Sequence, residues 1–278
     1  MSQRTVAAAL RAGAGVLTAA GVEGAARDAR LLMAHVLGLE AARMTLHLQD
    51  EITPEAQAAF DALVAERAAR RPVAQLTGRR QFYGRIFEVT PDVLDPRGDT
   101  ETLIAAALAE PFAHLLDLGT GSGCIALTLL AESDAQGLAT DISEAALAVA
   151  ARNAAALGVA ARVRLRRSDW FEAVEGRFDL IVSNPPYIAL GDMAGLAPEL
   201  AYEPRGALTD EADGLTAYRV IAAQAADYLD PGGRLMLEVG AGQAADVQEL
   251  LRLADYSDVQ HLHDLDGHER VVWGRKPA

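Results

Sequence analysis

Four consecutive residues, Asn184-Pro185-Pro186-Tyr187, bring together groups that could hold a flat, nitrogen-bearing substrate. The Asn184 side chain and the Pro185 main chain each offer a carbonyl oxygen as a hydrogen-bond acceptor. The two prolines have no N–H group, and together they stiffen and turn the chain. The Tyr187 ring offers a face on which a planar group can stack. Two adjacent prolines alone would predict only a rigid turn, so their neighbours decide the interpretation.

Such a site suits a planar NH₂ nitrogen that attacks an activated carbon. The lone pair of an amide or aromatic amine is delocalised, so this nitrogen is a poor nucleophile. Acceptors that take both N–H bonds favour a geometry in which the lone pair points at the donor, without a strong base. A sulfonium methyl group is already activated and needs no metal. The tetrapeptide therefore suggests methyl transfer, with Asn184, Pro185 and Tyr187 as catalytic residues, and leaves glutamine and adenine equally open as acceptors.

A glycine-rich segment, Gly119-Thr120-Gly121-Ser122-Gly123, lies between a predicted strand and a predicted helix. Glycines at such a turn let the main chain approach a ligand closely and direct helix N–H groups at it. A dinucleotide-binding fingerprint would need its third glycine where Cys124 stands, and the Gly-Lys pair of a phosphate-binding loop is missing. The segment therefore predicts a cofactor site of another kind.

Two further strand ends add groups that a nucleoside could use. Asp141 ends the second predicted strand, at roughly the 20-residue distance at which an acidic side chain meets ribose hydroxyls. Asp169 and Trp170 follow the third strand, where a carboxylate could accept from an exocyclic amine and an indole could cover a base. Each feature alone has an ordinary structural explanation, as a turn, a helix cap or a core residue. Together, in this order, they predict a nucleoside-bearing cofactor at one edge of a sheet.

Apolar runs that begin at His114 alternate with alanine-rich segments of helical spacing. Short buried strands that alternate with helices predict a parallel sheet with helices on both faces. The fourth strand, 178–183, leads directly into Asn184. Residues 258–273 have room for two strands and no helix between them, which predicts an antiparallel pair at the sheet edge. The pattern therefore predicts an α/β domain whose strand ends carry both candidate sites.

The first part of the chain predicts a separate small domain. Residues 1–75 are rich in Ala and Leu with helical spacing, and Thr53-Pro54 predicts the start of a helix that runs to about Arg71. Residues 76–97 gather aromatic and β-branched residues around a glycine, which predicts a β-hairpin linker. We therefore expect an all-helical domain over 1–75, the hairpin over 76–97 and the α/β domain over 98–278.

Residues 101–278 carry the whole formal net charge of −14, because acidic and basic residues balance over residues 1–100. An acidic catalytic domain argues against a protein that binds nucleic acid by neutralising phosphates. Cys124 is the only cysteine, so no intrachain disulfide can form, as is usual in a reducing compartment. The sequence has no signal-peptide pattern and no apolar run of about 18 residues. We expect a cytoplasmic protein without a membrane segment.

Several longer segments follow the pattern of one enzyme family. They are DARLLMAHVLG (28–38), RPVAQLTG (71–78), FYG (82–84), VLDPRGDTE (93–101), and then Glu203-Pro204, Asp213-Gly214-Leu215, Tyr218-Arg219, Pro231-Gly232-Gly233, Leu237-Glu238-Val239-Gly240 and Gln243. With these segments, the glycine-rich loop and the tetrapeptide, almost the whole chain resembles the protein-(glutamine-N5) methyltransferases that modify peptide chain release factors.

This resemblance implies a Rossmann-like, seven-stranded methyltransferase domain that uses S-adenosyl-L-methionine, preceded by a helical domain that helps to dock the release factor. It implies that the methyl group goes to the side-chain nitrogen of the glutamine in the factor's Gly-Gly-Gln motif. By matching motifs, residues 119–123, Asp141, Trp170 and Asn184 would contact the cofactor, and residues 184–187 would hold the glutamine. From the strand-end argument above, Asp169 joins the cofactor set.

Three positions depart from the family pattern. Gln75 stands where the family has an aromatic residue, Asp95 where it has Ile, and Gly98 where it has Pro. All three lie in the linker region, near the expected mouth of the site. They bear on how the protein substrate docks more than on the chemistry.

Two alternatives remain. A nucleic-acid adenine-N6 methyltransferase could use the same tetrapeptide after flipping the base, but the acidic domain and the lack of a basic recognition domain argue against it. The only candidate basic patch is Arg67, Arg70, Arg71, Arg79, Arg80 and Arg85, which we interpret as a solvated face or a docking surface for another protein. A binding module that has lost activity would retain labelled cofactor but never transfer its methyl group.

Two other features favour ordinary roles. His261 and His263 form a His-x-His pair without a cysteine or a clear third ligand nearby, so we expect a surface strand or loop and no metal. Glu238 ends an apolar strand, and we interpret it as a residue that orders nearby loops and is not catalytic.

Overall fold

Helices build the first part of the chain in the computed structural model, which describes residues 4–277. The elements are α1 (Val6–Ala19), α2 (Ala25–Leu37), the 3₁₀ helix η1 (Ala41–His47), α3 (Pro54–Ala68) and α4 (Val73–Thr77). Thr53 caps α3, because its hydroxyl accepts a hydrogen bond from Ala56 N at 3.2 Å. This helix ends at Ala68, before the expected Arg71, since Arg70 takes a left-handed conformation with φ of 77°.

A short segment from much later in the sequence packs with these helices. Residues Ala197–Tyr202 form one compact unit with the chain up to Arg79, whereas Arg80–Leu196 and Glu203–Ala278 form the second unit. The expected domain boundaries did not separate 197–202 from the rest of the α/β domain. The first unit is therefore built from two stretches of chain that are distant in sequence.

Polar contacts hold the 197–202 segment in place. Glu199 Oε1 accepts hydrogen bonds from Arg67 at 3.0 Å and from Arg70 at 3.1 Å. The Tyr202 hydroxyl donates to Ala69 O at 2.7 Å, and the Gln75 side chain donates to Tyr202 O at 2.7 Å. Gln75, one of the three departures from the family pattern, thus binds a main-chain carbonyl of this segment with its side-chain amide.

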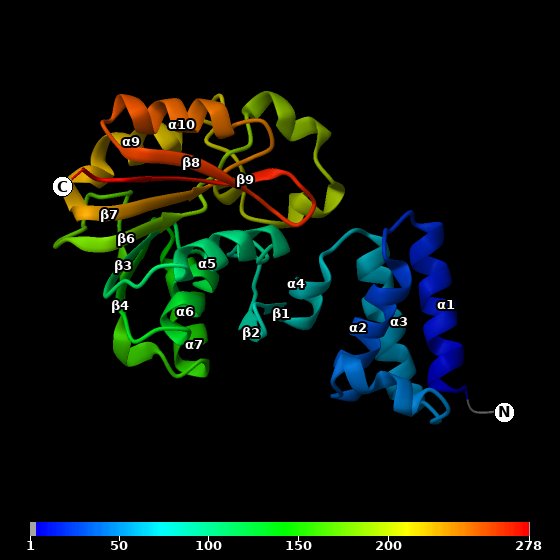
Figure 1. Cartoon of the computed structure of the whole chain (residues 1–278). Coiled ribbons are helices and arrows are strands. Elements are labelled where there is room, and N and C mark those ends of the chain that lie inside the picture. Colours follow the sequence, from blue (N-terminus) through cyan, green and yellow to red (C-terminus); the bar gives the residue numbers. More distant parts are fainter. Residues whose placement is uncertain (1–3, 278) are drawn as a thin grey trace. The chain divides into compact units, whose positions relative to one another are not determined.

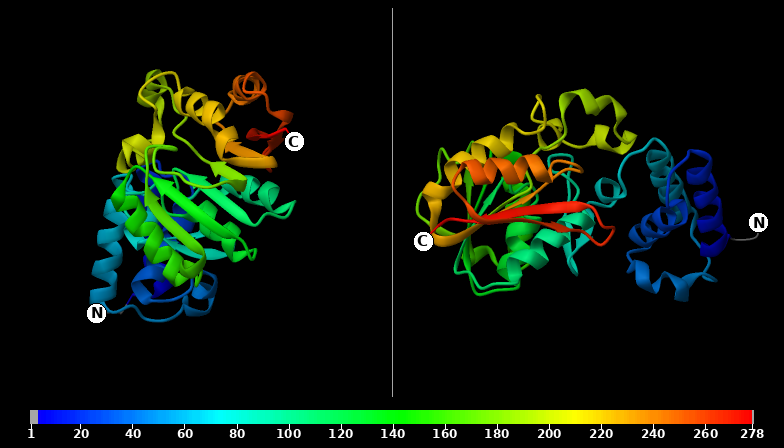
Figure 2. Two further views of the ribbon diagram at one scale, coloured as in Figure 1. Left: turned by 90° about the vertical axis from the view of Figure 1, so that its left-hand side faces the viewer. Right: turned by 45° about the horizontal axis from the view of Figure 1, so that its top comes forward.

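The second unit contains the expected mostly parallel sheet (Figures 1 and 2). Its strands are β3 (His114–Leu118), β4 (Gln136–Asp141), β5 (Val163–Arg167), β6 (Phe178–Ser183), β7 (Leu229–Glu238), β8 (Ser257–His263) and β9 (Glu269–Arg275). Their order is β5-β4-β3-β6-β7-β9-β8, and all neighbours from β5 to β7 are parallel. β9 runs antiparallel to both β7 and β8, so the predicted antiparallel pair at the edge is confirmed.

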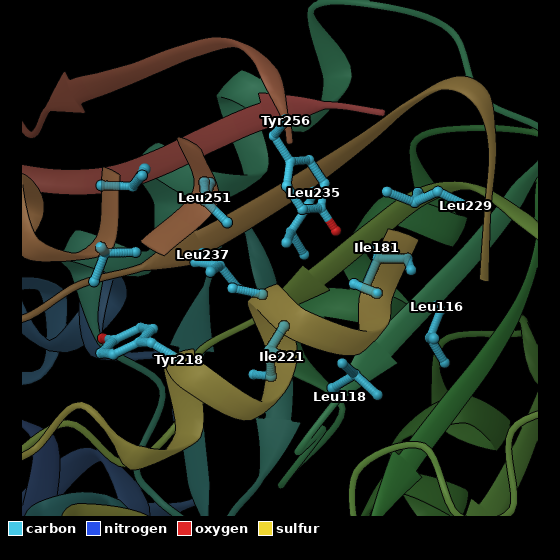
Figure 3. Close-up of a cluster of buried hydrophobic side chains, with 14 of the residues drawn as sticks. Leu116, Leu118, Ile181, Tyr218, Ile221, Leu229, Leu235, Leu237, Leu251 and Tyr256 are labelled. Carbon is cyan, nitrogen blue, oxygen red and sulfur yellow. The ribbon is translucent and has the colours of Figure 1, made fainter. Parts of the chain in front are cut away.

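Helices cover both faces of this sheet (Figure 1). They are α5 (Glu101–Leu108), α6 (Cys124–Ala131), α7 (Glu144–Ala156), α9 (Thr216–Tyr228) and α10 (Ala244–Leu253). The one-turn α8 (Arg205–Leu208) and the 3₁₀ turns η2 (Gly98–Thr100), η3 (Ala160–Arg162), η4 (Leu190–Gly195) and η5 (Pro198–Tyr202) lie elsewhere in the chain. Alternate strand residues enter two separate cores, as the period of two in a strand requires. Leu116, Ile181 and Leu237 pack with α9 and α10 (Figure 3), whereas Leu115 and Leu180 pack with α5 and α6.

A small hairpin precedes the sheet. It consists of β1 (Arg79–Phe82) and β2 (Arg85–Glu88) and lies within the expected linker. Asn153 of α7 ties it to the glycine-rich loop, since its side chain accepts from Glu88 N at 2.7 Å and donates to Ser122 O at 2.8 Å. Among residues 4–277, no helix is long and apolar enough to cross a membrane.

Candidate active site

All four segments that the sequence singled out follow adjacent strands of the sheet. The glycine-rich loop follows β3, Asp141 ends β4, Asp169 follows β5, and Asn184 follows β6. The strand order reverses between β3 and β6, and ligands of such sheets bind at this point, outside the carboxyl ends of the strands. The Ser183 hydroxyl donates to Leu118 O at 2.7 Å, which joins the ends of the two strands that carry the main motifs.

The three glycines of the loop have two different structural roles. All three have positive φ, at 71° for Gly119, 55° for Gly121 and 82° for Gly123. A Cβ atom on Gly119 or Gly121 would meet no atom within 4 Å, so these positions leave open space beside the main chain. A Cβ atom on Gly123 would lie 2.6 Å from Leu127 Cδ1. The first two glycines therefore leave room for a ligand, and the third allows the loop to pack on α6.

This difference gives a prediction about stability. Gly123→Ala should lower the free energy of unfolding by about 1–3 kcal/mol, because it combines a strained φ with a side-chain clash. Gly121→Ala is the matched control, since its strain is similar but its Cβ has room, so it should cost less stability and weaken cofactor binding instead. Urea denaturation of both variants measures the difference. Equal losses of stability would contradict the two-role assignment.

Asp141 orders the glycine-rich loop and does not cap α7. Its Oδ2 accepts a hydrogen bond from Gly121 N at 2.8 Å, and its Oδ1 accepts from Ser143 N at 2.9 Å. Ser143 itself caps α7 by accepting from Ala146 N at 3.2 Å. An ionised carboxylate has about four lone-pair sites, so two main-chain bonds leave acceptors for ribose hydroxyls.

Trp170 is held in a strained conformation at the end of β5. Its φ of 43° lies in the left-handed region, which is unusual for a bulky residue. The Ser168 hydroxyl donates to Trp170 O at 2.8 Å and accepts from Ala173 N at 3.0 Å, and these bonds maintain the turn. The indole is half-buried, whereas the neighbouring Asp169 is exposed. A partly open aromatic face beside a carboxylate is compatible with a nucleoside base.

Asp117, which was not among the predicted site residues, stabilises the glycine-rich loop by hydrogen bonds from the buried end of β3. Its buried Oδ2 accepts from the Thr120 hydroxyl at 2.6 Å and from Ala126 N at 3.3 Å. Burial raises the pKa of Asp117 to about 7, against the opposing hydrogen bond from Thr120. The sequence does contain an indication of this role, because Asp117 is the one acidic residue in the mostly apolar strand HLLDLG.

The tetrapeptide after β6 is fixed at its far end by Gln243. The Gln243 side chain donates to Tyr187 O at 2.9 Å and accepts from Gly240 N at 3.0 Å. Gly214 and Gly240 leave space for Tyr187, since a Cβ on Gly240 would lie 2.9 Å from Tyr187 Cδ2 and one on Gly214 would overlap Tyr187 O. Burial also raises the pKa of the Tyr187 phenol, so its hydroxyl stays protonated at neutral pH.

Glu238 lies buried beside the tetrapeptide. The last paired residues of β6 and β7 are Ser183 and Leu237, so Asn184 and Glu238 are the next residue on each strand. Burial raises the pKa of Glu238 to about 7, and the neighbouring Thr100 and Asn184 side chains oppose the shift. The Tyr218 hydroxyl donates to Glu238 O at 2.9 Å and fixes the main chain.

The other two departures from the family pattern lie near one ion pair. Arg97 donates to both oxygens of the buried Glu203 carboxylate, at 2.8 and 2.7 Å. Asp95 is buried, and Arg80 Nε lies 3.5 Å from its Oδ1. Burial raises the pKa of Asp95, although Arg80 and Arg97 oppose the shift. Gly98 is exposed at the start of η2.

The arginine-rich stretch does not form one solvated basic face, so that part of the interpretation was wrong, whereas its role in docking another protein stays a prediction. Arg67 is 7% exposed and pairs with Asp28 at 2.8 Å as well as with Glu199. Four of the other arginines also lie within 4.0 Å of a carboxylate: Arg70 with Glu199, Arg71 with Glu66, Arg80 with Asp95 and Arg85 with Glu132. These carboxylates neutralise charge that a phosphate backbone would need.

The groups at these strand ends fit S-adenosylmethionine. Gly119 and Gly121 leave open space beside the main chain, and Asp141 retains acceptor sites for hydroxyls. Trp170 offers a partly exposed apolar surface to a base. When bound, the cofactor supplies a methyl group on a positively charged sulfur.

Comparisons with known proteins agree with this geometry. Residues 8–78 match the PrmC N-terminal domain, and residues 92–210 match the methyltransferase small domain. The chain is 60% identical to the release factor glutamine methyltransferase of Cereibacter sphaeroides over 97% of its own length and 98% of that protein. It is 47% identical to the protein of the same name from Rhodospirillum rubrum, over 96% of this chain and 83% of that one.

A solved structure supports the fold. The crystal structure of a methyltransferase from Pyrococcus furiosus aligns with a TM-score of 0.55 at 22% identity, covering 78% of this chain and 98% of that chain. At this identity the likeness concerns the fold alone, which agrees with the α/β sheet expected from the strand pattern. With the near full-length relatives, these findings show that the chain belongs to the release factor glutamine methyltransferases, a family of S-adenosylmethionine-dependent enzymes.

Proposed function

We propose that this protein transfers a methyl group from S-adenosyl-L-methionine to the side-chain amide nitrogen, N5, of the glutamine in the Gly-Gly-Gln motif of peptide chain release factors. The observation that carries this proposal is the placement of Asn184-Pro185-Pro186-Tyr187 on the strand next to the one that leads into the glycine-rich loop. A donor held at the end of β3 and an acceptor held at the end of β6 would lie side by side.

Each residue of the tetrapeptide has a role in this proposal. The Asn184 side-chain oxygen and the Pro185 carbonyl accept the two N–H bonds of the glutamine amide, and Tyr187 packs against its planar face. Pro186 keeps the turn rigid. The amide is then oriented with its nitrogen lone pair toward the methyl group. This fixed geometry lowers the activation barrier, because the entropy cost of bringing the two groups together is met when the substrate binds. Residues 119–123, Asp141, Asp169, Trp170 and Asn184 hold the cofactor.

Labelled methyl transfer tests the substrate. The protein is incubated with labelled S-adenosylmethionine and either a release factor or adenine-containing DNA or RNA, and mass spectrometry locates the methyl group. We expect the label on the glutamine of Gly-Gly-Gln, and none on a factor in which this glutamine is alanine. Label on adenine would replace the proposal by the nucleic-acid alternative.

We also propose that the helical unit helps to dock the release factor and that the enzyme acts in the cytoplasm. Deleting residues 1–75 should lower kcat/KM on the intact factor. Because this deletion also removes Arg67 and Arg70 from Glu199, a control must separate docking from loop order. Glu199→Gln weakens those ion pairs and leaves the helices in place. A normal KM for Glu199→Gln together with a raised KM for the deletion supports a docking role for the helical unit. An unchanged kcat/KM for the deletion would contradict this role.

A further inference from the structure

Glu238 is a buried ionisable group to which the proposed reaction assigns no role. It is 1% exposed, and its Oε2 has no hydrogen-bond partner among residues 4–277. It lies next to Asn184 across two adjacent parallel strands, and the Tyr218 hydroxyl fixes its main chain. A buried carboxylate that lacks a full set of partners costs stability, so its presence beside the acceptor site needs an explanation.

The hydrogen-bonding groups of Glu238 and Asn184 suggest an explanation for this buried carboxylate. An ionised carboxylate can only accept hydrogen bonds, whereas the Asn184 amide carries both an acceptor oxygen and a donor NH₂. A hydrogen bond between these two neighbouring side chains can therefore form only through the Asn184 NH₂ group. The Asn184 side-chain oxygen, on the other side of the amide, then remains available to accept a hydrogen bond from the substrate. Without the carboxylate, either branch of the amide could face the substrate.

We propose that Glu238 is a positioning residue, whose carboxylate holds the Asn184 NH₂ group and thereby directs the Asn184 oxygen at the substrate nitrogen. This proposal rests on the function proposed above. Glu238 touches neither substrate nor cofactor in it, and acts only through Asn184. The neighbouring Thr100 side chain also favours the ionised carboxylate, because it lowers the pKa of Glu238.

The protonation state of Glu238 then controls which way Asn184 faces. A protonated carboxyl group can donate its O–H to the Asn184 oxygen and so turn the amide the wrong way. Burial raises the pKa of Glu238 to about 7, Arg270 opposes this shift and Asp99 adds to it, while the nearby phenols of Tyr187 and Tyr218 have raised pKa values and stay neutral. The active, ionised form is therefore lost as pH falls through about 7.

A double-mutant cycle tests this coupling. Glu238→Gln should lower kcat on the release factor by about 10- to 100-fold, because its amide can present either branch to Asn184, and the affinity for S-adenosylmethionine should change little. The acid limb of the pH–kcat profile should flatten. In an Asn184→Ala background the same substitution should cost less than about twofold. Equal losses in the two backgrounds would mean that Glu238 acts on the fold in general and would overturn the proposal.

A second readout needs no substrate. The side-chain NH₂ resonances of Asn184, identified in ¹⁵N spectra by their loss in Asn184→Ala, should shift with pH in the wild-type protein with a midpoint near 7. The shift should be absent in Glu238→Gln. Resonances that ignore pH in the wild type would refute the contact even if the variant fails to fold. Absence of methyl transfer by the wild-type protein would instead refute the proposed function, so the two failures are distinguishable.

The edge hairpin carries a separate arrangement of ligating groups. His261 and His263 project from β8, and Glu269, which begins β9, is the cross-strand partner of His263. Their ligand atoms all lie within 4.8 Å of one another, and His261 Nε2 is 3.4 Å from Glu269 Oε1. The sequence spacing showed only the His-x-His pair, because Glu269 lies beyond the hairpin turn.

The 3.4 Å separation between His261 Nε2 and Glu269 Oε1 matches the ligand spacing of a tetrahedral metal site, and His263 lies close enough to join them. Zinc–nitrogen and zinc–oxygen bonds of about 2.0–2.2 Å place two ligands of a tetrahedron about 3.3 Å apart. Two imidazoles and a carboxylate are a donor set that Zn²⁺ accepts, with a fourth position left for water. We infer that His261, His263 and Glu269 form a binding site for a divalent transition-metal ion such as Zn²⁺, apart from the methyl-transfer site.

Zinc titration of the full-length protein tests this site. In competition with a chromophoric chelator, the wild type should bind one equivalent of Zn²⁺, and His261→Gln and His263→Gln should each weaken binding by about tenfold or more. His114→Gln is the matched control, because His114 is also exposed and lies 3.7 Å from a carboxylate oxygen of Asp179. No binding by the wild type, or equal binding by all three variants, would overturn the inference.

Discussion

Asn184→Ala is expected to lower kcat for methyl transfer by on the order of 10³-fold, while the affinity for S-adenosylmethionine changes by less than about tenfold. The substitution removes an acceptor that is proposed to orient the glutamine nitrogen in the transition state. Asn184 is only half-buried, and its neighbours Ser183 and Pro185 are buried, so the end of the strand should survive the change. The loss should therefore fall on kcat.

The measurement is steady-state methyl transfer to the release factor, with cofactor binding followed by calorimetry. Circular dichroism and thermal unfolding serve as controls for the fold. An equal loss of cofactor affinity and of kcat would count against the acceptor role, because it would place Asn184 mainly in the cofactor site.

Asp141→Ala is expected to produce the opposite pattern, with the dissociation constant for S-adenosylmethionine raised by about 10- to 100-fold. The substitution removes the proposed acceptor for ribose hydroxyls. It also removes the partner of Gly121 N, which makes a 2.8 Å hydrogen bond to Asp141 in the present structure. The glycine-rich loop would lose order as well as a ligand contact. At saturating cofactor, kcat should recover most of its normal value.

Asp141→Asn provides a graded control, since its amide oxygen can accept from Gly121 N but lacks the second carboxylate oxygen. Its affinity should lie between those of the wild type and Asp141→Ala. Normal binding with slow turnover in Asp141→Ala would defeat the ribose assignment. Measured together, the Asn184 and Asp141 variants separate the acceptor site from the cofactor site.

Much of the fold could be predicted because its determinants are local in sequence. The strand at 178–183 has the predicted bounds, and Thr53-Pro54 marks the start of α3 as expected. The segments that carry the candidate site could be found for a related reason. In a parallel sheet the carboxyl ends of the strands share one edge, so the residue after each strand is placed there by topology.

The supporting contacts could not be predicted, because they depend on register between distant segments. Gln243 binds Tyr187 O from 56 residues away, and Arg67 binds Glu199 from 132 residues away. Glu238 lies beside Asn184 only because β7 pairs with β6 in one particular register. Periodicity gives the face on which a side chain lies, but not which residue of a non-neighbouring segment it meets.

The 197–202 segment has a consequence for limited proteolysis. The chain passes between the two units at Arg79–Arg80, again at Leu196–Ala197 and a third time at Tyr202–Glu203. A protease cut after Arg79 severs only the first of these passages. The cleaved helices would still be bound to Glu199 and Tyr202, which remain covalently part of the other fragment. The two fragments should therefore co-elute under native conditions and separate only in denaturant.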